Sequence, residues 1–143
     1  MSRILIVEDE QAIRRVLKKI LSEEDKSHEI VEAENGIEAL NVIKKSQLDL
    51  IISDIKMPKV DGIEILAYVK KNNPDVPLIM ISGHGDLDLA VDCMKKGAYD
   101  YISKPPDLNR LLTTVRNALD RKKLILENRL LKKRIISDFQ MIG

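Results

Sequence analysis

Five short runs rich in β-branched and aliphatic residues recur along this sequence, and helical patterns separate them. The runs are RILIV (3–7), EIVEA (29–33), DLIIS (49–53), PLIMI (77–81) and YDYIS (99–103). A run such as Leu50-Ile51-Ile52 is typical of a strand that is buried on both faces of a sheet. Because strands that alternate with helices form parallel sheets covered on both sides, the sequence predicts an α/β fold. We expect five parallel strands, doubly wound by helices.

The segments between and after these runs predict five helices. One face of the first helix is apolar and holds Ile13, Val16, Leu17, Ile20 and Leu21. The next three helices are expected at about 36–45, 62–72 and 86–97, and a long fifth helix begins near Asp107. Glycines and prolines fall at the junctions, where turns require them.

The composition excludes some classes of protein. The chain has 143 residues, enough for one domain with a full core. With 24 Lys+Arg and 23 Asp+Glu, the net charge of +1 predicts neither nucleic-acid nor membrane binding. No run of 18 apolar residues occurs and the start lacks the form of a secretory signal, so we expect a cytoplasmic protein. The single cysteine, Cys93, falls in a helical pattern and is expected to be a small buried side chain.

Polar residues stand where the predicted strands end, which is where doubly wound sheets bind ligands. They are Glu8, Asp9, Asp54, Ser82 and Lys104. If these strands are neighbours, three carboxylates, a hydroxyl and an ammonium meet at one edge. A hard divalent cation would offset the clustered negative charge, and Mg²⁺ is the cation we expect. The chemistry left to such a site is phosphoryl transfer, with a carboxylate as nucleophile.

Some of these carboxylates have a structural alternative. Asp9 could instead cap the first helix, and we interpret Asp61 and Asp107 as caps of the third and fifth. Asp54 has no such alternative, because no helix is expected to begin directly after it. Lys104 alone is typical of a surface lysine. The signal is therefore the combination of residues at the strand ends.

Three segments, ILIVEDE, LIISDIKMPKVDGIEIL and LIMISGHGDLDLAVDCMKKGAYDYISKPPD, together resemble the receiver domain of two-component response regulators. The resemblance covers about residues 3–120. It implies the flavodoxin-like receiver fold, with strand order 2-1-3-4-5. It also implies that Asp54 accepts a phosphoryl group from a sensor histidine kinase.

The resemblance further implies roles for the neighbouring residues. The Mg²⁺ ligands would be Asp9, Glu8 (through water), Asp54 and the main-chain carbonyl of Lys56. Lys104 would bind phosphoryl oxygens, and the Lys104–Pro105 peptide would be cis. Ser82 and Tyr101 would switch the face formed by helix four, strand five and helix five. The chain would be no enzyme beyond catalysing its own phosphorylation and dephosphorylation.

Two shorter segments, ISGHGDLDLAV and KKGAYDYISKPPDLNRLL, look like receivers of sigma-54-dependent transcription activators of the nitrogen-regulation type. On this interpretation residues 1–120 are the receiver domain. Residues 121–143 are a helical linker and dimerisation segment that leads to an ATPase domain and a DNA-binding domain outside this chain.

The linker pattern predicts a homodimer. Leu124, Asn128, Leu131 and Ile135 recur at steps of four and three, as in a coiled-coil seam with one polar position. Residues 120–134 are basic but contain no aromatic residue, so we interpret the run as a solvated helix face rather than a nucleic-acid site.

Two other functions remain open from the sequence. A stand-alone phosphotransfer carrier without DNA output would have the same site. A phosphatase-like hydrolase would use Asp54 as nucleophile, but it would need a second acid where Lys56 stands.

Overall fold

The computed structural model describes residues 2–142, and the side chains of residues 2–131. Its strands are β1 (Arg3–Val7), β2 (Glu29–Ala33), β3 (Leu50–Asp54), β4 (Leu78–Ser82) and β5 (Asp100–Ser103). They form one parallel sheet in the order β2-β1-β3-β4-β5, which confirms the predicted fold and strand order. The last three strands begin one residue later than predicted, so that Asp54 and Ser82 are the final residues of their strands.

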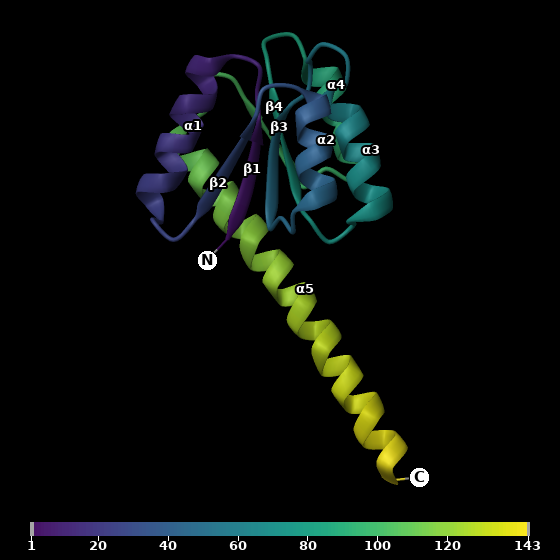
Figure 1. Cartoon of the computed structure of the whole chain (residues 1–143). Helices are drawn as coiled ribbons and strands as arrows, with labels where there is room; N and C mark the ends of the chain where they lie inside the picture. The colour runs from purple at the N-terminus through teal and green to yellow at the C-terminus, as the bar shows by residue number, and fades with distance from the viewer. Residues whose placement is uncertain (1, 143) are drawn as a thin grey trace.

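Five helices cover the two faces of this sheet. They are α1 (Gln11–Glu24), α2 (Gly36–Lys45), α3 (Gly62–Asn72), α4 (Leu87–Lys95) and α5 (Leu108–Ile142). Helices α1 and α5 pack on one face, and α2, α3 and α4 pack on the other (Figure 1). Helix α5 continues as one element of 35 residues and projects away from the sheet at the end opposite the loop that follows β3.

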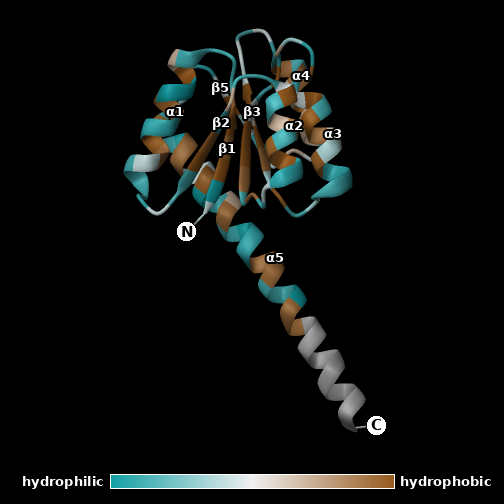
Figure 2. Cartoon of the chain, in the orientation of Figure 1, coloured by the Kyte–Doolittle hydropathy of each residue, from teal (hydrophilic) through white to brown (hydrophobic). Residues whose placement is uncertain are grey.

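The three central strands, β1, β3 and β4, are apolar on both sides because both sides are covered. Along β1, Leu5 contributes to the core beneath α2, α3 and α4, whereas Ile4 and Ile6 contribute to the core beneath α1 and α5. In Figure 2 the brown strands lie between helices whose outer surfaces are largely teal. Cys93 is fully buried in the first of these cores, as predicted.

Helix starts show which acidic residues are caps. Asp61 Oδ1 accepts a hydrogen bond from Glu64 N at 2.9 Å, and Asp107 Oδ1 accepts one from Arg110 N at 3.1 Å. Both predicted caps are confirmed. Helix α1 differs, since the residue before it is Glu10 and no side chain caps it. The alternative that Asp9 caps α1 is therefore wrong, and its carboxylate stays exposed.

One predicted core position is also wrong. Val16 is 50% exposed, whereas Leu17 and Leu21 on the same helix are 1% exposed. The third buried residue of α1 is Arg14, which lies three residues before Leu17 on the same face. Val16 lies outside the buried face of α1, because that face is narrow and Arg14 occupies part of it.

Charged contacts along α5 hold this helix to the amino end of the sheet. Arg116 pairs with Glu24 of α1, and Arg129 pairs with Asp75 in the loop before β4. Between them, Lys122 Nζ donates to Asp49 Oδ1 at 2.7 Å and to the carbonyl of Leu48 at 3.2 Å.

Among the helices that the structure describes, none is both long enough and apolar enough to cross a membrane.

Candidate functional site

Strand register brings the predicted site residues to one edge of the sheet, which we call the carboxyl edge. Ser53 of β3 is level with Val7 of β1, so that Glu8 and Asp54, one residue further on, reach the edge side by side. Ser82 ends β4 and is level with Ser103 of β5. Lys104 follows, and its main-chain N–H donates to the carbonyl of Ser82 at 2.8 Å.

Lys104 lies among the carboxylates at this edge. Its Nζ is 3.0 Å from Asp54 Oδ2, 2.8 Å from Glu8 Oε1 and 3.8 Å from Glu10 Oε1. The Lys104–Pro105 peptide is cis, as the resemblance implies. Burial alone would lower the pKa of Lys104, but Glu8 and Asp54 outweigh it and raise that pKa above its ordinary value. The ammonium therefore stays charged at any physiological pH. The sequence had not indicated Glu10 as a neighbour.

Carboxylate oxygens of Glu8, Asp9 and Asp54 all lie within 4.8 Å of one another. Glu8 is 1% exposed and Asp54 is 5% exposed, while Asp9 is exposed. Among the described residues, neither carboxylate oxygen of Glu8 has a hydrogen-bond donor, since Oε1 approaches Lys104 at ion-pair distance but outside hydrogen-bond geometry. Burial raises the pKa of Glu8 to about 8, and the neighbouring Asp54 adds to the effect while Lys104 opposes it.

This set of groups fits a divalent cation. A buried carboxylate without a donor, such as that of Glu8, is costly, and the three carboxylates around one point outnumber the single ammonium of Lys104. The donors are all oxygens, which are the ligands that Mg²⁺ prefers. The structure thus places three of the four predicted metal ligands together. The contact that the structure shows for Lys56 involves its side chain. That the main-chain carbonyl of Lys56 is a metal ligand stays a prediction.

The close approach of α3 fixes the backbone after Asp54. Gly62 N donates to the carbonyl of Ile55 at 2.8 Å. A Cβ at Gly62 would lie 2.4 Å from the carbonyl oxygen of Asp54, so only glycine fits there. The loop between Asp54 and α3 is therefore held tightly at both ends.

A salt bridge joins the loops that follow β3 and β4. Lys56 Nζ lies 2.8 Å from Asp86 Oδ1, and Asp86 Oδ2 accepts a hydrogen bond from Gly83 N at 3.2 Å. Asp86 is 6% exposed, while His84 in the same loop is exposed. The Lys56–Asp86 pair, which the sequence did not predict, spans the rim of the carboxyl edge.

The two predicted switch residues lie near this edge but at different depths. Ser82 is 3% exposed at the end of β4, and the residue before it is level with Asp54. Tyr101 is level with Met80, further down the sheet, and packs partly buried on the core beneath α3 and α4. Their movement on phosphorylation is not a property of a single structure and stays a prediction.

Sequence reasoning missed Arg14, which is buried beneath the carboxyl edge. Its Nη1 donates to the main-chain carbonyl of Glu8 at 2.8 Å. A basic residue in a helix is usually taken as exposed. Its spacing from Leu17 and Leu21, at three and seven residues, was the signal that placed it on the buried face.

Comparisons with known proteins agree with this geometry. A family model described as "Response regulator receiver domain" matches residues 4–116. The chain is 37% identical to the "Putative response regulator NtrX-like" of Rickettsia bellii, and the match covers 98% of the chain. It is 39% identical, again across 98% of its length, to the nitrogen assimilation regulatory protein NtrX of Azorhizobium caulinodans. It spans 29% and 31% of these two proteins.

A solved structure gives the same result in three dimensions. The crystal structure of NtrX from Brucella abortus superposes with a TM-score of 0.86 at 38% identity, over 94% of this chain and 30% of that one. The family match, the sequence identity and the structural likeness all indicate one kind of domain. The chain is a member of the response regulator receiver domain family.

Proposed function

We propose that Asp54 accepts a phosphoryl group from a phosphohistidine of a sensor histidine kinase in the cytoplasm. The observation that carries the proposal is the position of the Asp54 carboxylate, 3.0 Å from Lys104 Nζ and beside Glu8 and Asp9 at one edge of the sheet. A nucleophilic carboxylate with a fixed ammonium beside it has the parts that phosphoryl transfer requires.

In the transfer step, an Asp54 carboxylate oxygen forms a bond to phosphorus while the N–P bond of the phosphohistidine breaks. The imidazole leaves with the electron pair and later takes a proton from water. Lys104 Nζ then donates to a phosphoryl oxygen in place of Asp54 Oδ2. Glu8, Asp9, Asp54 and the carbonyl of Lys56 would hold Mg²⁺, which when bound supplies positive charge against the phosphoryl oxygens. The chain would catalyse this step and the hydrolysis of its own acyl phosphate, and no other reaction.

The phosphoryl group then changes the face formed by α4, β5 and α5. It adds roughly −1.5 to −2 charge and new acceptor oxygens. The Ser82 hydroxyl donates to one of them and draws the loop before α4 inward, and Tyr101 follows. Support comes from α4, where Leu87, Val91 and Met94 recur at steps of four and three and are 59%, 42% and 37% exposed.

The output is proposed to be a sigma-54-dependent transcription activator. Residues 1–120 are the receiver and residues 121–143 the linker, with ATPase and DNA-binding domains expected in the intact protein. The NtrX relatives extend far beyond the part that this chain matches, which favours this output over a stand-alone phosphotransfer carrier.

The test of the site is direct. The protein is incubated with acetyl phosphate and Mg²⁺, and the modified residue is located by mass spectrometry. We expect modification of Asp54 alone, abolished by chelator and absent in Asp54→Asn. Incorporation that survives in Asp54→Asn would assign the phosphoryl group to another residue, and incorporation that survives chelator would remove the Mg²⁺ requirement. Either result would overturn the proposal.

A homodimer through α5 is part of the same proposal. Leu124 and Leu131 are 64% and 55% exposed and Asn128 is exposed, while Ile135 lies outside the described side chains. A coiled-coil seam on a second copy would cover these residues. Light scattering on the full chain should give a dimer mass, which Leu124→Asp with Leu131→Asp reduces to a monomer. Leu126→Asp, off the seam but equally exposed, should leave the dimer intact. A monomer in the unsubstituted chain would contradict the prediction.

A further inference from the structure

Arg14 is a buried arginine that reaches back from α1 to the loop carrying the acidic residues. Only 7% of the residue is exposed. Its Nη1 donates to the main-chain carbonyl of Glu8 at 2.8 Å, and this hydrogen bond is itself buried. Hydrogen bonds from a charged donor are about twice as strong as those between neutral groups. An arginine in such a place holds the loop far more firmly than a surface contact would.

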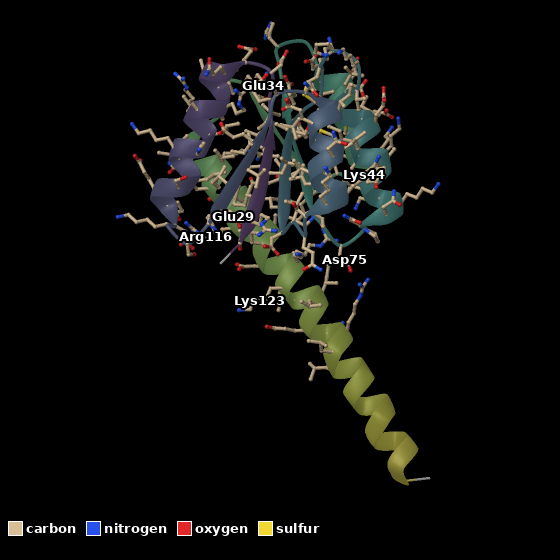
Figure 3. All side chains as sticks on the ribbon, in the orientation of Figure 1. Glu29, Glu34, Lys44, Asp75, Arg116 and Lys123 are labelled. Atoms are coloured by element: carbon tan, nitrogen blue, oxygen red, sulfur yellow. The ribbon has the colours of Figure 1, made fainter. Side chains whose placement is uncertain are left out.

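Acidic residues of β2 and the loop after it hold the guanidinium in turn. Arg14 Nε lies 3.4 Å from Glu32 Oε1, and Nη2 lies 3.7 Å from Glu34 Oε1. Figure 3 labels Glu34 at the carboxyl edge of the sheet, close to the end of α1 that carries Arg14. The planar fork of an arginine can serve all three acceptors at once, which a lysine cannot.

Both main-chain polar groups of Glu8 are thereby fixed. Its N–H donates to the carbonyl of Ala33 at 3.1 Å, and its carbonyl accepts from Arg14. The loop has no other support from the helix, because no side chain caps the start of α1. Arg14 is the donor to the Glu8 carbonyl, so the position of the Glu8 and Asp9 carboxylates depends on Arg14 as well as on the Ala33 hydrogen bond and the Lys104 ion pair.

We infer that Arg14 is a positioning residue for the Mg²⁺ site, acting through the carbonyl of Glu8. This inference rests on the proposed function, since it assumes that the carboxylates bind the cation. Without the donor, the buried carbonyl of Glu8 is left unsatisfied, and the loop moves to find another partner. Glu8 and Asp9 move with it, and the geometry around the cation is lost.

The experiment measures Mg²⁺ affinity by calorimetry on the full chain. Groups that orient metal ligands typically contribute 10- to 100-fold in affinity, and we expect Arg14→Met to raise the Mg²⁺ Kd by about tenfold. Arg14→Lys keeps the charge and one donor, and should raise it by about threefold. Arg15→Met is the matched control, because Arg15 is exposed and makes no hydrogen bond or ion pair with the side chains that the structure describes.

A second measurement distinguishes a loss of metal-ligand positioning from a general loss of protein stability in the Arg14 variants. With acetyl phosphate as donor, Arg14→Met should require about tenfold more Mg²⁺ for half-maximal phosphorylation, and reach a maximal rate within about twofold of wild type. Folding of each variant is checked by circular dichroism, and Arg14→Lys decides the matter if Arg14→Met does not fold.

The outcomes are distinct. A folded Arg14→Met or Arg14→Lys chain that binds Mg²⁺ with wild-type affinity overturns the role of Arg14 and leaves the proposed function intact. An equal loss of affinity in Arg15→Met attributes the effect to net charge and also overturns it. A wild-type chain that binds no Mg²⁺ overturns the inference and the metal site together.

Discussion

The two edges of the sheet handle charge in opposite ways. At the amino edge, where α5 leaves the domain, three basic side chains of α5 are each paired with one carboxylate: Arg116 with Glu24, Lys122 with Asp49, and Arg129 with Asp75. Figure 3 labels Arg116 and Asp75 at this end. At the carboxyl edge, Lys104 is the one cation within ion-pair distance of the carboxylates of Glu8 and Asp54 among the described residues.

This difference separates structure from function. Pairs that balance one to one stabilise the fold, while an excess of buried carboxylates has to be offset by a bound proton or by a ligand. The presence of a surface groove does not distinguish the functional edge from the structural one. A groove of about 550 Å³ lies between α1 and α5 at the amino edge, lined by residues such as Leu21, His28 and Leu119, far along the strands from Asp54. The chemistry of this domain is found from charge and not from the depth of a cavity.

The largest expected effect compares the same substitution at the two edges. Lys104→Met removes the cation beside Asp54, and we expect phosphorylation by acetyl phosphate to slow by roughly 100-fold or more. Lys122→Met removes a cation at the amino edge, where it should cost at most about 1 kcal/mol of unfolding free energy and leave the phosphorylation rate unchanged. Initial rates and chemical denaturation measure the two quantities. Equal rates in the two variants would remove the functional distinction between the edges.

The second prediction is that pH acts oppositely at the two edges. The pKa of Glu8 is raised from 4.5 to about 8, so the Mg²⁺-free protein should lose unfolding free energy as pH rises from about 4.5 to 8. The loss should be on the order of a few kcal/mol, because the folded state binds the extra proton. Lys104 does not contribute in this window, because its pKa lies above the window in both states, at the ordinary value of 10.5 when unfolded and higher when folded.

Asp49 gives the contrast at the amino edge. Burial would raise the pKa of Asp49, but Lys122 and the N–H of Arg3 hold it below its usual value. Its stabilising effect is present above the ordinary pKa of 3.8 and is lost as pH falls below it. Denaturation at several pH values checks both signs. Glu8→Gln or saturating Mg²⁺ should remove the loss between pH 4.5 and 8, and a slope that persists in Glu8→Gln would assign it to another group.

The smallest effect concerns the rim of the carboxyl edge. Lys56 and His84 stand two residues after Asp54 and Ser82, where we predict that they flank the path of water to the acyl phosphate. Lys56→Ala also breaks the pair with Asp86, and each variant should change the rate of dephosphorylation several-fold with the fold unaffected. The rate of dephosphorylation is measured from the decay of the phosphorylated protein after acetyl phosphate has been removed. Lys59→Ala, an exposed change in the same loop, should decay as wild type does. Identical decay in all variants would show that the rim has no role.

Much of the fold was predictable because strands buried on both faces leave a plain apolar signal. The segments that form β3 and β4 show this signal, and the polar residues Asp54 and Ser82 at their ends indicate the site from the sequence alone. Positions that depend on a tertiary contact were not predictable from pattern alone. Val16 was assigned to the core of α1, where the structure places Arg14 instead, because a buried arginine is favourable only when acceptors such as the Glu8 carbonyl surround it. Glu10 and the Lys56–Asp86 pair were missed for the same reason, since their partners are far apart in sequence.

The unbroken length of α5 has a mechanical consequence. Among the described side chains, Arg129 is the last one of α5 that pairs with the rest of the domain, and from Arg129 to Ile142 the helix runs on for about 13 residues, or roughly 20 Å. A tilt of about 10° at the point of attachment would displace the far end by about 3.5 Å, while the residues at the attachment itself move by a fraction of an ångström. Small rearrangements of side chains at the base of the sheet thus become a much larger displacement at the far end of the helix, which projects from the sheet in Figure 1.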